Sequence, residues 1–345
     1  MLRATLLSAL GCCAVLLSAT AAHAATLRVP AHYRTIQAAV DAAAPGDRIR
    51  VSRGRYCGAT LTKPVRLEGH GRPRIIGCTT SPVTSPGVRA GFYLPGTQGV
   101  NPASGSHIRG FVFDGQGVSN ANLAPLSVGV FARFANDVRV ESNRFIGTVQ
   151  AITNTGGDRW RIKRNRIEQL TLFDCTVRCS GGDGIIIALA IGGLAAPGGA
   201  SAAINRPEDN LIAGNIIEGT LPDGFSAFSM AGVLLLSADR TTVRSNRLRL
   251  RDNPTASATG QGILVSNTCC GLGVGFLPGS RFTTIKYNDA RQSEVGIVVE
   301  GTGGANTEGL YLRRNRGSLQ IEGVAQLALA ARARVLSPVL AQPEL

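Results

Sequence analysis

The chain is poor in histidine, in acidic residues and in long apolar runs. It has four His residues, and the three that follow residue 24 lack the cysteine spacing of a zinc site, so we expect no metal centre. After residue 24 no apolar run is long enough to span a bilayer. Asp and Glu number 22 against 36 Lys and Arg, which gives a formal net charge of +14. This imbalance favours acidic partners such as uronic-acid polysaccharides, lipopolysaccharide or nucleic acid.

Lysine is also scarce, which qualifies the argument from charge. Lys occurs only at positions 63, 163 and 286, so almost every cation is an arginine. An Arg-, Ala- and Gly-rich composition explains such a bias as well as a binding function does. Net charge alone therefore does not identify a partner.

The first 24 residues have the pattern of an export signal. Arg3 is their only charge, an apolar run follows, and small residues at Ala22 and Ala24 mark a cleavage site. The alternatives are a membrane helix, for which the run is short, and a lipidation site at Cys12, which lies early in the run. We expect residues 1–24 to be a signal peptide and the protein to be secreted or periplasmic.

Six cysteines remain after this segment, an even number that suggests disulfides in an exported chain. They are Cys57, Cys78, Cys175, Cys179, Cys269 and Cys270.

A short pattern recurs along the chain. The octapeptide WRIKRNRI at 160–167 has relatives such as VRVESNRF at 138–145 and TTVRSNRL at 241–248, each with apolar residues at fixed offsets before an Asn. The Asn positions are 143, 165, 215, 246, 288 and 315, at spacings of 22 residues or more. A segment usually opened by Gly, such as GVLLLS at 232–237, precedes each copy. Because all these segments alternate with period two, the repeat predicts a β-solenoid.

The opening of the mature chain carries a family resemblance. Residues 26–71, TLRVPAHYRTIQAAVDAAAPGDRIRVSRGRYCGATLTKPVRLEGHG, are similar to the start of right-handed parallel β-helix proteins of the pectin-lyase-like superfamily. The resemblance implies an all-β, right-handed parallel β-helix over 25–320, with a short capping helix near 35–44. It does not fix the function, because the family includes lyases, glycoside hydrolases, epimerases, adhesins and binding proteins.

In such a coil the recurring Asn has a structural role. An inward amide at a turn bonds to the same group in the next coil, so we expect a ladder of Asn143, Asn165, Asn215, Asn246, Asn288 and Asn315. Residues beside the inward apolar positions then point outward and stack along one basic face. The predicted ligand-binding residues are Arg139, Arg161, Lys163, Arg166, Arg244, Arg247, Lys286 and Arg313. Cys57 and Cys78 lie about one coil apart and are our predicted disulfide.

The Gly-led strands correspond to the sheet that carries the active site in lyases of this family. Their outward positions are largely apolar, whereas a calcium-dependent lyase needs converging carboxylates and a base. A glycoside hydrolase needs a pair of carboxyl groups. The sequence offers only scattered candidates for catalysis, namely Asp183, Asp223, Asp239, Arg133 and Glu300.

An apolar strip on these strands needs a cover. Three parts could bury it: a second subunit, the C-terminal segment or the inserts between strands. We place the inserts at 168–182, 191–207, 218–230, 249–259 and 267–280. Residues 322–336 have helical spacing and are expected to cap the solenoid, within a C-terminal cap and tail at 321–345.

We therefore expect an exported β-helix protein that binds acidic polysaccharide along a basic face and has no recognisable catalytic site. The alternatives are a polysaccharide lyase or glycoside hydrolase with an insert-built site, and a structural cell-surface protein. No cofactor is expected, with calcium only if the chain is a lyase. We expect no nucleic-acid partner, and an oligomer only through the apolar strand face.

Overall fold

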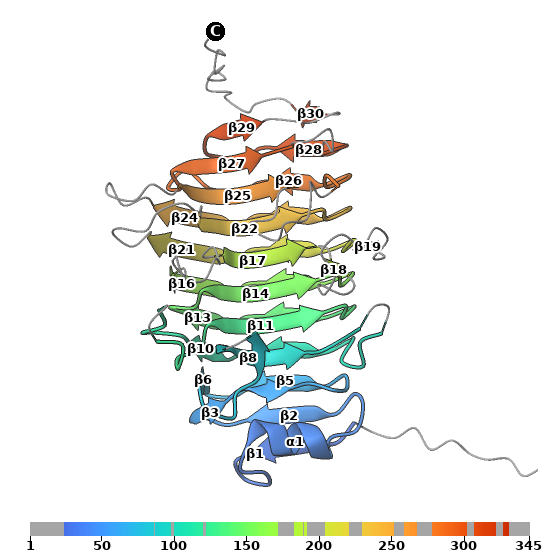
Figure 1. Cartoon of the computed structure of the whole chain (residues 1–345), viewed down its shortest axis with the longest axis vertical. Coiled ribbons are helices and arrows are strands. Elements are labelled where there is room, and N and C mark those ends of the chain that lie inside the picture. The colour runs from blue at the N-terminus through green and yellow to red at the C-terminus, as the bar shows by residue number, and fades with distance from the viewer. Residues whose placement is uncertain are drawn as a thin grey trace, which may run out of the picture.

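The computed structural model describes residues 24–85, 87–97, 100–119, 122–171, 183–188, 190–191, 204–220, 230–251, 259–267, 278–301, 307–321 and 327–330. In these ranges the chain winds into stacked coils from the N-terminal to the C-terminal end (Figure 1). Three sheets, which we name A, B and C, are built of parallel pairs between coils. The predicted right-handed parallel β-helix is thereby confirmed. Most of the predicted export segment (residues 1–23), Asp223, Cys175, Cys179, Cys269 and Cys270 lie outside the described residues.

Sheet A contains the strand that precedes each ladder asparagine, and it runs the whole length of the stack. Its strands, in spatial order, are β1 (Thr26–Val29), β2 (Arg48–Val51), β5 (Arg66–Gly69), β9 (His107–Arg109), β12 (Arg139–Glu141), β15 (Arg161–Lys163), β20 (Leu211–Ala213), β23 (Thr242–Arg244), β26 (Thr284–Lys286), β28 (Leu310–Arg313) and β30 (Leu327–Ala330).

Sheet B contains the strand that follows the asparagine turn. Its labels run up the left side of Figure 1. In spatial order its strands are β3 (Arg55–Cys57), β6 (Arg74–Ile76), β10 (Val112–Asp114), β13 (Arg144–Ile146), β16 (Arg166–Leu170), β21 (Ile216–Thr220) and β24 (Arg247–Arg251).

Sheet C contains the Gly-led strands. They are β4 (Ala59–Thr60), β8 (Val88–Leu94), β11 (Val128–Arg133), β14 (Gln150–Thr155), β17 (Asp183–Ala188), β22 (Met230–Leu236), β25 (Gly260–Ser266), β27 (Val295–Val299) and β29 (Leu319–Ile321). Two antiparallel pairs lie beside the coils: β7 (Val83–Ser85) with β8, and β18 (Ala190–Ile191) with β19 (Ile204–Asn205).

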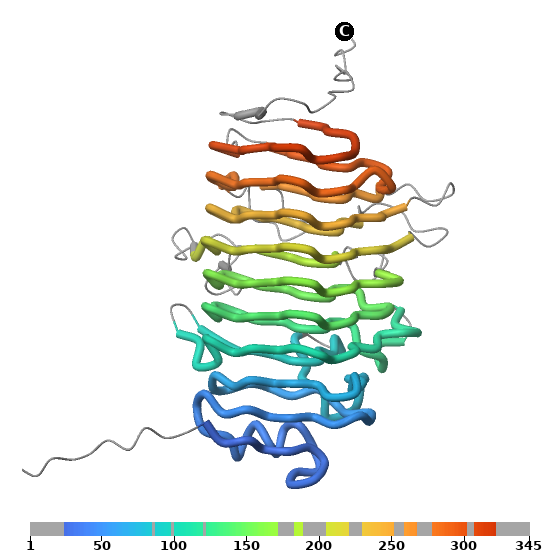
Figure 2. Tube along the Cα trace, turned by 180° about the vertical axis from the view of Figure 1, so that it is seen from behind, coloured from blue at the N-terminus to red at the C-terminus, as the bar shows by residue number. Residues whose placement is uncertain are grey.

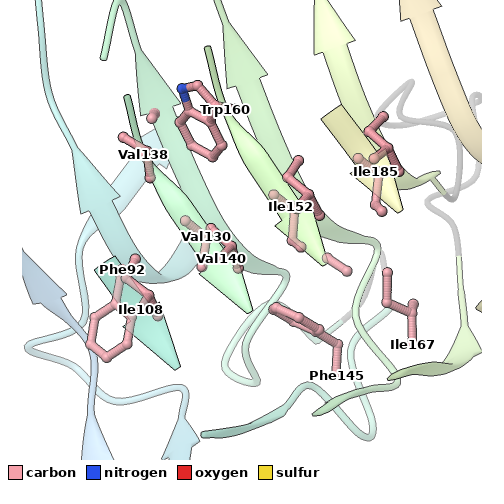
Figure 3. Packing of buried hydrophobic residues seen from close by; sticks show 14 of the residues in the cluster. Phe92, Ile108, Val130, Val138, Val140, Phe145, Ile152, Trp160, Ile167 and Ile185 are labelled. Carbon is pink, nitrogen blue, oxygen red and sulfur yellow. The ribbon is translucent and has the colours of Figure 1, made fainter. Parts of the chain in front are cut away.

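The three sheets enclose a narrow apolar core. Figure 3 shows Val140 of sheet A, Phe145 of sheet B and Ile152 of sheet C pointing into it, and all three are fully buried. Side chains along a strand point to its two faces, so one side of each strand faces the core and the other faces outward. The Phe113 and Phe145 rings stack across neighbouring coils with centroids 4.5 Å apart.

A short helix closes the N-terminal end. Helix α1 (Ile36–Ala42) starts at Thr35, whose side-chain oxygen accepts a hydrogen bond from Ala38 N at 3.1 Å. Its buried residues Ile36, Ala39 and Val40 lie on the apolar core of the first coils. The predicted capping helix is therefore present at the blue end of the stack, which Figure 2 shows from behind.

The asparagines form a continuous ladder at the turn between sheets A and B. Asn165 Oδ1 accepts from the backbone N of Asn143 at 3.0 Å, and Asn215 Oδ1 accepts from the N of Asn165 at 2.9 Å. The same contact continues through Asn246, Asn288 and Asn315. Each amide nitrogen also donates to a strand carbonyl, as Asn215 Nδ2 does to Ile162 O at 3.0 Å. The ladder thus supplies partners for buried backbone groups that the turn would leave unpaired.

A disulfide joins two neighbouring coils on sheet B. Cys57 at the end of β3 bonds to Cys78, two residues after β6, with their Cα atoms 5.4 Å apart. The predicted pairing of these two cysteines is confirmed.

Two expectations about secondary structure were wrong. The predicted helix at 322–336 contains a strand instead, because Leu327–Ala330 pairs in parallel with β28 and so extends sheet A by one coil. The LALA sequence of this stretch also has period two. Three predicted inserts begin too early, since residues 168–170, 218–220 and 249–251 belong to β16, β21 and β24.

No helix in the described part of the chain is long and apolar enough to cross a membrane.

Candidate functional site

The predicted basic face is in fact two faces. Sheet A carries six of the predicted ligand-binding residues: Arg139, Arg161, Lys163, Arg244, Lys286 and Arg313. Arg166 and Arg247 open β16 and β24 of sheet B. The asparagine turn lies between these two sets, so residues before and after it point away from different sheets. The expectation of one continuous basic face was wrong for this reason.

On sheet A the cations stand in two outward columns. The first passes through Arg48, Arg66, His107, Arg139 and Arg161 on successive strands. The second, over the same strands, reads Arg50, Glu68, Arg109, Glu141 and Lys163. Glu68 accepts from Arg109 at 2.9 Å and lies 3.5 Å from Arg48. The N-terminal half of this face is therefore a mixture of cations and carboxylates.

On sheet B arginines occupy the first outward position of most strands. In register, this column contains Arg55, Arg74, Val112, Arg144, Arg166, Ile216 and Arg247. Arg249 and Arg251 add outward cations on the last strand, β24. Neighbouring rungs lie about 4.8 Å apart, so these arginines form a row along the axis of the solenoid that is interrupted at Val112 and Ile216.

This face is hollowed along its length. A hollow of ≈ 800 Å³ is lined by Arg74, Arg144, Glu168, Glu218, Arg249 and Arg251, among others. It shares Gln116 with a hollow of ≈ 330 Å³ beside Arg55, and shares Arg249 with one of ≈ 280 Å³ beside Arg247 and Arg291. We call the three together the arginine furrow.

Two carboxylates in the middle of the furrow hold the arginines in place. Glu168 accepts from Arg144 Nε at 2.5 Å and is also bonded by Arg166. Arg166 reaches Glu218 at 3.6 Å, and Arg249 binds Glu218 at 3.0 Å. Burial raises the pKa of Glu168, but the hydrogen bonds from Arg166 and Arg144 outweigh burial and hold this pKa below its ordinary value. Both carboxylates are thus partners of arginines.

Other arginines of the furrow have no carboxylate partner in the described ranges. Arg55, Arg247 and Arg251 are exposed, and none of them forms an ion pair within the described part of the chain. Each guanidinium carries five N–H donors in a planar fork that matches a carboxylate. The furrow therefore contains exposed guanidinium groups that can donate hydrogen bonds to a ligand, beside arginines that are already paired with Glu168 and Glu218.

Asp183 is the most perturbed of the predicted catalytic candidates. It opens β17 on the outer side of sheet C, in register with Gln150 and Ala231. Burial raises its pKa to about 7, and the backbone of Ala231 provides an opposing hydrogen bond. No second carboxylate lies in register beside it on the neighbouring strands β14 and β22.

Asp239 is buried and paired with two arginines. Its carboxylate is 1 % exposed and accepts hydrogen bonds from Arg206 and Arg281, both at 2.5 Å. Burial opposes ionisation, but these two bonds keep the pKa of Asp239 below its ordinary value. It lies at the turn that leads from sheet C into sheet A.

The remaining candidates do not meet. Arg133 ends β11 and Glu300 follows β27, and these two positions belong to one outward column of sheet C. Five rungs separate them, about 24 Å. Asp223 lies outside the described residues. Within the described ranges, no group of three or more His, Cys, Asp or Glu side chains is arranged to hold a metal ion.

Sequence reasoning missed most of the furrow. Arg55, Arg74, Arg249 and Arg251 were not among the predicted binding residues, although RLRLR at 247–251 alternates as an outward-inward strand does. Glu168 and Glu218 were assigned to inserts. The alternation is obscured at these strands by a register shift between Ile167 and Leu170, and by Gly219 at an inward position.

No protein-family model and no curated protein sequence matches the chain. Its structure is similar to that of PfbA, a surface adhesin of Streptococcus pneumoniae, with 12% identity and a TM-score of 0.51 over 85% of this chain and 76% of the adhesin. It is also similar to an alginate lyase from Paenibacillus sp., with 14% identity and a TM-score of 0.44 over 87% of this chain and 99% of the lyase. A polygalacturonase from Erwinia carotovora shows 13% identity and a TM-score of 0.40, over 88% of this chain and 96% of the enzyme. Likeness at this level of identity establishes the fold alone, and the likeness to the adhesin agrees with the parallel β-helix that the three sheets form.

Proposed function

We propose that this protein binds acidic polysaccharide in the arginine furrow of sheet B and does not cleave it. The observation that carries the proposal is the row of arginines along three adjoining hollows, in which Arg55, Arg247 and Arg251 have no carboxylate partner among the described residues. The fold likeness brings no ligand with it, so the proposal rests on this surface.

The shape and the charge of the furrow suit a linear polyanion. Two like charges about 4 Å apart repel by about 1 kcal/mol in bulk water. The arginines that line the furrow outnumber its carboxylates. A chain of uronate residues lying along the solenoid would place a carboxylate against successive rungs. It would relieve this repulsion and release counterions, so binding should weaken as salt rises.

Binding is tested with the mature protein on pectate, alginate and a neutral galactan. We expect salt-sensitive retention on the two polyuronates and none on the galactan. An Arg247→Ala/Arg251→Ala variant should weaken polyuronate binding at least about tenfold, because two charge-assisted hydrogen bonds are lost.

The matched control is Arg28→Ala/Arg34→Ala, which removes two exposed arginines at the N-terminal end. This control lowers the net charge equally and should change affinity less than about twofold, since bulk charge acts mainly through screened long-range attraction. Equal weakening by both variants would overturn the assignment of binding to the furrow.

A hydrolytic function is the second candidate, and Asp183 is the observation that favours it. A carboxyl group with its pKa raised to about 7 is suited to general acid catalysis near neutral pH. A reducing-end assay on the same polysaccharides tests this candidate. Product formation that Asp183→Asn abolishes would replace the binding-only function.

We also propose that the protein is exported. The Cys57–Cys78 disulfide suits an oxidising compartment, and the first 24 residues have the pattern of a signal peptide. Amino-terminal sequencing of the protein recovered outside the cytoplasm should begin at Ala25. A protein that retains Met1 would contradict export by this route.

A further inference from the structure

Two large aromatic side chains are exposed at the two ends of strand β26 on sheet A. Phe282 is 58% exposed and Tyr287 is 41% exposed. Their positions are five residues apart in a chain that rises about 3.3 Å per residue, so about 16 Å separates them across the sheet. They lie at opposite corners of one coil, before and after the strand Thr284–Lys286.

Both aromatics have a left-handed backbone conformation. Phe282 has φ 54° and Tyr287 has φ 58°. The equivalent corners of other coils share this left-handed conformation. They carry smaller, charged or glycine residues, namely Asp137, Arg159, Asp209, Arg240 and Gly309 at one corner and Ser142, Arg164, Gly214, Ser245 and Arg314 at the other. A bulky aromatic is an unfavourable choice there, and exposure brings it no compensating burial.

Between the aromatics lies an unbroken column of cations. Arg244, Lys286 and Arg313 are in register on β23, β26 and β28. Beside them stand Thr242, Thr284 and Tyr311, which add hydroxyl groups. Neither Arg244 nor Lys286 has an ion-pair partner among the residues that the structure describes. The column is bounded by Ala213 on β20 and Ala330 on β30.

The aromatic rings are directed toward the cation-bearing coil that follows. The Arg313 guanidinium lies 5.9 Å from the centre of the Tyr287 ring. At the other corner, a Cβ atom added to Gly309 would lie 2.6 Å from Phe282 Cδ1, so the Phe282 ring rests against this glycine. The rings therefore flank the rungs of β26 and β28 rather than turning away from sheet A.

We propose that Phe282, Tyr287, Arg244, Lys286, Arg313 and Thr284, which we call the aromatic patch, form a second binding site for an acidic oligosaccharide lying across the strands. Sugar rings offer apolar C–H faces to exposed aromatic rings, and uronate carboxylates pair with Arg and Lys. Hydroxyl groups of Thr284 and its neighbours suit sugar hydroxyls. The inference shares its ligand class with the proposed function but rests on a different sheet.

The test uses an oligogalacturonate and inorganic polyphosphate as probes, measured by titration calorimetry on the Arg247→Ala/Arg251→Ala background. In this background the furrow is weakened and the aromatic patch is intact. A Phe282→Asn/Tyr287→Asn variant should lose oligogalacturonate affinity by at least about tenfold while it keeps polyphosphate binding, because polyphosphate has no ring faces. A Lys286→Ala/Arg313→Ala variant should lose affinity for both probes.

The melting temperature of the variants distinguishes a binding role of Phe282 and Tyr287 from a structural role. Asn tolerates the left-handed conformation, so Phe282→Asn/Tyr287→Asn should leave Tm unchanged or raise it. Ser142→Asn, at the equivalent corner of an earlier coil, is the matched control and should change neither affinity nor Tm. Unchanged oligogalacturonate binding in the Phe282→Asn/Tyr287→Asn variant, or parallel losses for both probes, would overturn the aromatic patch.

The proposals for the furrow and for the aromatic patch can be contradicted independently. If the furrow substitutions alone leave oligogalacturonate binding unchanged and the aromatic substitutions abolish it, the proposed function loses its site and the aromatic patch stands. The reverse result would overturn the aromatic patch and leave the furrow standing.

Discussion

At the scale of single residues, the ladder asparagines provide hydrogen-bond partners for buried groups at the turn of each coil. Asn215 is fully buried, and its Oδ1 accepts from both the N and the Nδ2 of Asn165, at 2.9 and 3.1 Å. Its own Nδ2 donates to Ile162 O and to Asn246 Oδ1, both at 3.0 Å. Every hydrogen-bonding group of this amide therefore has a buried partner.

Asn215→Ala should destabilise the protein by roughly 2–4 kcal/mol, because several buried groups lose their partners at once. The free energy of unfolding is measured by denaturant titration. Asn315 at the end of the ladder is only half buried, so Asn315→Ala is the control and should cost less. Equal costs at the two positions would contradict the role of the ladder.

Asp183 makes stability depend on pH. Its folded pKa of about 7 lies above the ordinary 3.8, so the folded state holds a proton that the unfolded state releases. This contribution is fully present below about pH 4 and is lost as pH rises toward 7 and beyond. The shift corresponds to about 4 kcal/mol at pH 8.

Asp183→Asn should therefore stabilise the protein at pH 8 relative to the wild type and change little at pH 4. Unfolding free energies of both proteins across this range give the difference, which cancels the other titrating groups. A difference that is flat with pH would show that the Asp183 carboxyl is not held neutral.

At the scale of elements, the structure shows how far the repeat can be read from sequence. The Asn positions and the Gly-led strands were predictable, because a polar residue buried once per coil interrupts the apolar alternation at a fixed place. The sheet B strands were harder to delimit, because Gly219 takes an inward position and Glu168 precedes a register shift. The division of the cations between two sheets depends on the direction of the asparagine turn, which alternation does not encode.

The first coils depend on a covalent link as well as on packing. Cys57 and Cys78 close a loop of 21 residues between β3 and β6. A Cys57→Ser/Cys78→Ser variant should lose about 3 kcal/mol of stability, as the unfolded chain gains freedom. Thermal unfolding with and without reductant measures this, and reductant should lower the Tm of the wild type only. A variant as stable as the wild type would contradict a stabilising role for this link.

At the scale of the whole molecule, the solenoid turns a local pattern into long surfaces of repeated charge. A single cation on one strand attracts a polyanion only weakly, whereas a cation repeated at the same position on many coils can contact successive charges of one polymer. The arginine furrow runs along the axis, and the aromatic patch lies across it near the C-terminal end. As proposed, the two sites would contact different lengths of an acidic chain.

The most direct test of the central claim is to locate the bound polymer on the protein. Arginine-selective covalent labelling, read by mass spectrometry, compares the mature protein with and without saturating polygalacturonate. We predict that the ligand protects Arg55, Arg247 and Arg251 in the furrow, while the exposed Arg34 at the N-terminal end remains fully labelled. Labelling of Arg55, Arg247 and Arg251 that is unchanged by polygalacturonate would contradict binding in the furrow.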